Sequence, residues 1–245
     1  MDDPAATTDL DTRLRALTPT PWALYLMVAL NFGVWAANLL DGMSPIAPLS
    51  SDLLRWGANS PQTIVGGGQY WRLLTAAFLH SGATHLALNM VGLWSAGPLV
   101  NRLYGNAQCL LIYLGSALVA NATSVLFAPP QSLSVGASGA VFGVLGALIV
   151  AVFQQRGRLP IGTGKNILAT QGAFVLYSLG QGFSHTGTDN AAHVGGLVAG
   201  GLMAWVLVER LDDQATITRR ALRVAEAVGL LAAGLVLLLG MAGVH

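Results

Sequence analysis

One serine stands where an apolar stretch of the chain begins, in the segment Gly136-Ala137-Ser138-Gly139. In the first turn of a helix the backbone N–H groups have no intrahelical partner, and the helix dipole favours negative charge nearby. This position suits a nucleophile whose attack on a carbonyl creates an oxyanion. The alternative is that Ser138 and its flanking glycines only allow close helix packing, as small residues commonly do in membrane helices.

A histidine begins another apolar stretch, in the segment NAAHVGG that runs from Asn190 to Gly196. A histidine in a membrane helix is costly and suggests a function, and imidazole titrates near neutral pH, which suits proton transfer. A hydroxyl is a weak nucleophile until a base within hydrogen-bond reach takes its proton. His193 is therefore the candidate base for Ser138, and the alternative is a histidine that hydrogen-bonds a neighbouring helix.

Glycines four residues apart follow both candidates. They are Gly139 and Gly143 after Ser138, and Gly196 and Gly200 after His193. Small residues at this spacing line one helix face and let two backbones approach closely. If these two faces pack together, Ser138 and His193 come to the same depth.

The residues around the pair indicate whether a third catalytic group is expected. Phe142 lies one turn after Ser138 on the same face and is expected to stack on the imidazole, so that Phe142, Gly136 and Gly139 support the pair. No Asp or Glu lies in the two apolar stretches that carry Ser138 and His193, which predicts a dyad rather than a triad. Asp189 is near His193 in sequence and is expected to lie in water.

Two more polar residues begin a further stretch, His85 and Asn89. They are four residues apart and therefore share one helix face. Both donate hydrogen bonds, so if aimed at Ser138 they would form an oxyanion hole together with the Ser138 amide. The alternative is that they hold two helices together by hydrogen bonding.

The composition indicates which solvent surrounds these helices. Of the 245 residues 53% are hydrophobic and 9% are charged, and the mean hydropathy is +0.60. A soluble domain carries about 25% charged residues, so the bilayer is the expected solvent and a partner of the chain. The net charge of +1 argues against nucleic acid, and no spacing of Cys or His indicates a metal site. No cofactor is expected, and the single Cys109 is interpreted as a packing residue.

The apolar stretches predict an all-α polytopic membrane protein. Seven can be marked, at Pro21–Leu40, His85–Leu103, Gln108–Phe127, Ala137–Gln155, Asn166–Gly182, Ala191–Val208 and Ala225–Val244. Most reach the ~20 residues that a spanning helix needs, and the fifth and sixth are less hydrophobic because they are rich in small and polar residues. We expect a cytoplasmic segment at 1–20, a six-helix core at 21–208 with a structured outer loop at 41–84, a cytoplasmic linker at 209–224, and an extra transmembrane helix at 225–245.

The basic residues predict the orientation. With the N-terminus inside, ten of the 12 Lys and Arg residues fall in inner segments, and only Arg55 and Arg72 fall outside. Seven spans then place the C-terminus outside. Compact loops and the lack of an organelle address favour a bacterial cytoplasmic membrane.

The three motifs together, in the order His85 to Asn89, Gly136 to Gly139 and His193 to Gly196, resemble the rhomboid family of intramembrane serine proteases. The resemblance covers about Gln69 to Leu207. It implies a six-helix core with a water-filled site open to the outer side, and the seventh stretch resembles the six-plus-one arrangement of many members.

The resemblance also implies residue roles. Ser138 would be the nucleophile and His193 the general base, with His85 and Asn89 at the oxyanion positions. Gly196 and Gly200 match the family's small-residue face, and Trp71 and Arg72 match the tryptophan–arginine pair of its first outer loop, where Arg72 would be a structural anchor. Two departures are Gln69, where many members have Glu, and Phe142, where some bacterial members have Tyr.

The function expected is therefore a serine endopeptidase that acts on transmembrane segments of other membrane proteins. The alternative is a catalytically inactive rhomboid-like protein that binds transmembrane clients. A small transporter or channel is disfavoured because no inverted repeat is evident. His80 and His185, in outer segments near the site, are expected to be solvated loop histidines.

Overall fold

The computed structural model describes residues 12–156, 159, 162–184, 188–207 and 216–243. In these ranges the chain is helical, and its only β-structure is an isolated antiparallel bridge between Asn59 and Ser134. A long helix lies in each predicted apolar stretch; the helices are α2 (Trp22–Leu40), α5 (Ala83–Tyr104), α6 (Asn106–Phe127), α7 (Ser138–Gln154), α8 (Thr163–Ser184), α9 (Asn190–Val206) and α10 (Ile217–Ala242). The all-α prediction is confirmed.

Several of these helices suit a bilayer. Among the described residues, α2, α6 and α10 are long and apolar enough to cross one, with mean hydropathies of 1.6, 1.8 and 2.2, and α7 is apolar but shorter. Only 6% of the most apolar 18-residue segment of α10 is buried inside the protein, so leucine side chains of this helix are exposed on the outside of the bundle. A surface of this kind is stable in lipid and not in water, and the chain is a multi-pass membrane protein.

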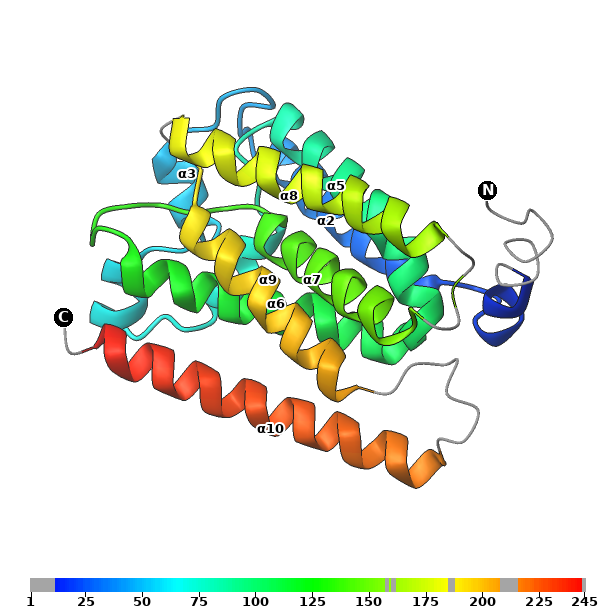
Figure 1. The fold of residues 1–245 in the computed structure, drawn as a ribbon. Helices are drawn as coiled ribbons and strands as arrows, with labels where there is room; N and C mark the ends of the chain where they lie inside the picture. The colour runs from blue at the N-terminus through cyan, green and yellow to red at the C-terminus, as the bar shows by residue number, and fades with distance from the viewer. Residues whose placement is uncertain (1–11, 157–158, 160–161, 185–187, 208–215, 244–245) are drawn as a thin grey trace.

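Helices α6, α7 and α9 form the centre of the fold, with α7 packed most extensively against α9 (Figure 1). The glycines of the two helices put backbone against backbone. A methyl group on Gly196 would overlap the carbonyl of Gly139, and one on Gly200 would overlap the carbonyl of Gly143. On its other side, Gly143 leaves room for the hydroxyl of Ser116 on α6. The predicted packing of the two glycine faces is present.

Helix α10 lies on the outside of this centre, against α6 and α9 (Figure 1). It begins at Ile217, eight residues before the apolar stretch predicted at 225, so the second half of the expected linker is helical. Near its other end, Leu238 and Leu239 pack with Ile64 and Leu73 of the long loop between α2 and α5. The C-terminal end of α10 and this loop therefore lie at the same end of the bundle.

The long loop between α2 and α5 has its own structure. It contains α3 (Ser50–Arg55), a π-helical turn η1 (Gln62–Gly66), α4 (Arg72–Thr75) and a 3₁₀ turn η2 (Ala76–Phe78). Short helices of this kind satisfy part of the loop's own backbone. Helix α6, against which the loop packs, satisfies another part, as in the bond from Asn121 Nδ2 of α6 to the Leu73 carbonyl at 2.8 Å.

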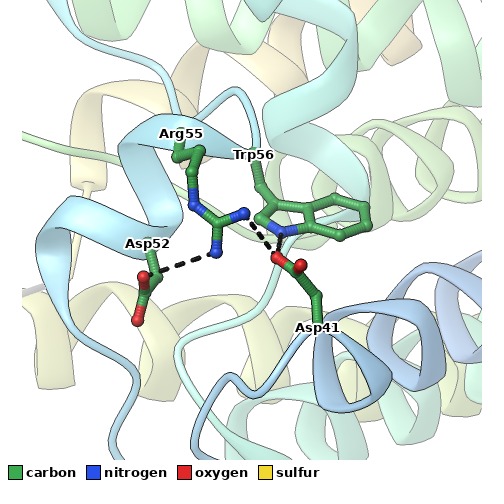
Figure 2. Close-up of polar contacts among 4 residues, drawn as sticks. All are labelled: Asp41, Asp52, Arg55 and Trp56. Carbon is green, nitrogen blue, oxygen red and sulfur yellow. Dashed lines mark hydrogen bonds and ion pairs between the residues drawn. The ribbon is translucent and has the colours of Figure 1, made fainter.

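A cluster of polar side chains fastens the start of this loop to the end of α2 (Figure 2). Asp41 accepts a hydrogen bond from Trp56 Nε1 at 2.7 Å and pairs with Arg55, which also pairs with Asp52. The Trp56 hydrogen bond, followed by Arg55, lowers the pKa of Asp41. A lowered folded-state pKa means that this contact stabilises the loop above the unfolded pKa and is lost as the pH falls through the folded value.

Replacing Gly200 with alanine tests the close crossing of α7 and α9. The new methyl group meets the Gly143 carbonyl, so the helices must separate; overpacking of this kind costs about 1–3 kcal/mol. We expect a lower thermal unfolding midpoint in detergent. The matched control is Gly172→Ala on α8, where a methyl group meets nothing within 4 Å and the midpoint should hold or rise. Equal midpoints for both variants would show that the close contact at Gly200 does not limit stability.

Candidate active site

Ser138 is the first residue of α7 and is partly buried. The segment before it is fixed by backbone hydrogen bonds to the long loop. Gly136 N–H donates to the Ala76 carbonyl at 2.9 Å, and Ser134 exchanges two backbone bonds with Asn59. Gly136 has φ +132°, a conformation that residues with a side chain rarely adopt. The turn thereby delivers Ser138 to the start of α7 with its backbone amide outside the helical ladder.

His85 and Asn89 converge on this turn from α5. A side-chain carbon at Gly136 would lie 2.7 Å from Cε1 and 2.9 Å from Nε2 of His85, and 3.6 Å from Nδ2 of Asn89. Asn89 is buried and donates from Nδ2 to the His85 carbonyl at 3.1 Å, which holds the amide in place. The two donors predicted from their spacing therefore face the backbone two residues before Ser138, and no side chain intervenes because position 136 is glycine.

His193 lies on α9 and stacks on Phe142 of α7, with ring centroids 4.2 Å apart and an interplanar angle of 4°. The imidazole is buried, and its Nδ1 has no hydrogen-bond partner among the described residues. Phe142 is one turn below Ser138, so the stack holds the imidazole beside the first turn of α7. The described residues include no hydrogen bond from Ser138 to His193; such bonds often tighten only when substrate binds.

Asp189, predicted to lie in water, is partly buried, and its carboxylate has two hydrogen-bond partners in the protein. Its carboxylate caps α9 by accepting from the Ala192 N–H at 2.9 Å, and it also accepts from the Ser124 hydroxyl of α6 at 2.5 Å. The cap itself is visible in the sequence, as an Asp just before an apolar stretch, but the partner on α6 is not. Asp189 therefore fixes the end of the helix that carries His193.

His80 is also not solvated as predicted. Its side chain is 2% exposed and meets His85 edge to face, with ring centroids 5.3 Å apart. Burial, followed by the neighbouring His85, lowers the pKa of His80 to about 3, so this ring is neutral at physiological pH. No sequence signal distinguishes it from a loop histidine, because its burial depends on the fold of residues 41–84. His185 lies outside the described residues.

Arg72 is buried in the long loop and joins three of its segments. Its Nε donates to Gln69 Oε1 at 2.7 Å, and its NH1 donates to the Leu54 and Ala58 carbonyls at 2.7 and 3.2 Å. The guanidinium also lies 4.7 Å from the Trp71 ring centroid. The arginine thus has structural partners, and Gln69 supplies a neutral acceptor where a carboxylate would form an ion pair. Among the described residues no group of three His, Cys, Asp or Glu is placed to hold a metal.

Residues 67–210 match the family model of the rhomboid domain. The chain is 37% identical to the rhomboid protease GluP of Bacillus subtilis over 180 residues, which is 74% of this chain and 34% of GluP. It is 30% identical to the rhomboid protease AarA of Providencia stuartii over 205 residues, covering 74% of this chain and 72% of AarA. The match thus spans about a third of the length of GluP.

Replacing Gln69 with glutamate tests the anchoring of Arg72. The bond from the guanidinium to Gln69 already has a charged donor, and a carboxylate adds an opposite charge to it. At a partly exposed position such an ion pair contributes about 0.2–1 kcal/mol. We expect Gln69→Glu to raise the unfolding midpoint at pH 7, and Gln69→Ala to lower it. The control is Gln62→Glu, on the exposed side of η1, which should change little. A lower unfolding midpoint for Gln69→Glu than for wild type would contradict the view that the contact between residue 69 and Arg72 stabilises the loop.

Replacing Asp189 tests the cap on α9. Asp189→Ala removes the bonds to Ala192 and Ser124, and loss of a cap costs about 0.5–2 kcal/mol. Asp189→Asn keeps an acceptor for the amide and a donor for the hydroxyl. We therefore expect a clear drop in the unfolding midpoint for alanine and a small one for asparagine. If both variants have the same lowered unfolding midpoint, the charge of the carboxylate stabilises α9 and its hydrogen bonds do not.

Proposed function

Because the chain belongs to the rhomboid family of proteases, we propose that it is an intramembrane serine endopeptidase that cleaves transmembrane segments of other membrane proteins. The observation that carries this proposal is the convergence of three helices on one turn. His85 and Asn89 of α5 face Gly136, Ser138 begins α7 two residues later, and His193 of α9 is held by its stack on Phe142. A binding protein would need none of this arrangement.

The mechanism that we propose is acyl transfer through a Ser–His dyad. His193 takes the proton of Ser138 as the hydroxyl attacks the scissile carbonyl, and then gives that proton to the leaving amine. Donors on His85, Asn89 and the Ser138 amide stabilise the oxyanion of each tetrahedral intermediate. Water, activated by His193, then releases the acyl group from Ser138. Phe142 and the unpartnered Nδ1 of His193 support a dyad without a third, carboxylate member.

For topology we propose six spans, α2 and α5 to α9, with α10 as a seventh, an inner N-terminus and an outer C-terminus. The bias of Lys and Arg toward inner segments supports this. The packing of Leu238 and Leu239 near the end of α10 against the long loop also fits a C-terminus on the same side as that loop. We propose a bacterial cytoplasmic membrane as the location.

The proposed substrates follow from the site's place at the start of α7. A transmembrane helix presents no free backbone carbonyl, because its backbone is hydrogen-bonded internally. The substrate must therefore unwind near the outer membrane boundary before Ser138 can attack. Helix-breaking or small residues at that boundary would favour cleavage.

Labelling with a fluorophosphonate probe in membranes, with the labelled residue mapped, tests the proposal. We expect the probe on Ser138, and none on the Ser138→Ala or His193→Ala variants, while both still insert and fold. Peptidase activity should fall by a factor on the order of 10⁴ or more in each. Ser178→Ala on α8 is the control and should be labelled normally. A wild-type protein that binds transmembrane segments but is neither labelled nor active would instead favour the binding function.

A further inference from the structure

Ser81 contacts the imidazole of His85 with two groups. Its backbone N–H donates to His85 Nδ1 at 3.4 Å, and its hydroxyl lies 2.9 Å from the same nitrogen. A backbone N–H can only donate, so Nδ1 must present its lone pair as an acceptor. In a neutral imidazole the proton is then on Nε2. Ser81, which is separated from the start of α5 by Gly82, therefore sets which ring nitrogen of His85 carries the proton.

The other ring nitrogen faces the catalytic turn. Nε2 of His85 lies 2.9 Å from where a side-chain carbon of Gly136 would be. The buried, uncharged ring of His80 meets His85 edge to face and closes off a further side of the imidazole. With Nδ1 engaged by Ser81, the N–H of His85 is directed at the segment that leads into Ser138.

We propose that Ser81 is a positioning residue that fixes His85 in its Nε2–H tautomer, so that His85 donates a hydrogen bond to the oxyanion. This inference rests on the proposed function. In the other tautomer Nε2 would carry a lone pair, which repels an oxyanion instead of stabilising it. Ser81 acts only through His85 and does not touch the reacting atoms.

The first test measures kcat and KM of purified wild type, Ser81→Ala, Ser81→Thr and His85→Ala on a transmembrane peptide substrate. Loss of an oxyanion donor lowers kcat by about 10²–10³-fold, which sets the expectation for His85→Ala. Ser81→Ala retains the weaker backbone donor, so we expect a roughly tenfold drop in kcat with KM nearly unchanged. Ser81→Thr keeps the hydroxyl and should restore most of kcat. Ser51→Ala, at an exposed serine on α3 in the same loop, is the control.

The double variant Ser81→Ala with His85→Ala separates positioning from a merely structural role. If Ser81 acts through His85, the double variant has the kcat of His85→Ala alone. A further tenfold drop in the double variant would overturn the proposal, as would a Ser81→Ala enzyme with wild-type kcat.

Nitrogen NMR shifts of labelled histidine, assigned with His85→Ala, provide a readout independent of turnover. Wild type should show His85 protonated on Nε2 and bare at Nδ1, and Ser81→Ala should show a mixture. A wild-type His85 protonated at Nδ1 would overturn the proposal. Failure of the proposed function is distinguishable, because wild type would then show neither probe labelling on Ser138 nor turnover, whatever the tautomer.

Discussion

The contact of glycine backbones between α7 and α9 is the constraint on which the rest of the structure depends. The carbonyls of Gly139 and Gly143 occupy the space that side chains of Gly196 and Gly200 would need. Helices this close have one register, because a slide along the axis brings larger residues into the crossing. Gly139 follows Ser138 directly and Gly196 comes one turn after His193, so the same crossing sets the relative height of the hydroxyl and the imidazole.

A hydrogen-bonded loop completes the site that this crossing begins. The Gly136 N–H bonds to the Ala76 carbonyl, and the buried guanidinium of Arg72 holds the carbonyls of Leu54 and Ala58. The loop therefore determines where the backbone before Ser138 runs and how closely His85 approaches it. Asp189 acts in a similar way on α9, because its carboxylate bonds both the first turn of α9 and Ser124 of α6.

Neutral polar side chains carry most of the hydrogen bonding between segments in the interior. Asn121 bonds the Leu73 carbonyl, Asn59 bonds the Asn121 carbonyl, and Asn101 accepts from the Leu24 N–H. In a protein surrounded by lipid, an unsatisfied backbone group costs several kcal/mol, and a charge costs more unless it is paired. Side-chain amides satisfy irregular backbone without that cost. The buried ring of His80 also belongs to this neutral interior.

The sequence by itself determined the long helices, because continuous apolar stretches have only one way to satisfy their backbone in lipid. It also singled out Ser138, His193, His85 and Asn89 as candidate site residues, and the helical spacing placed Phe142 on the face of Ser138. Tertiary structure alone decided that Asp189 meets Ser124, 65 residues away, and that His80 is buried. Periodicity fixes which face a residue occupies, whereas a loop's course and its hydrogen-bond partners depend on contacts between distant segments that leave no local pattern.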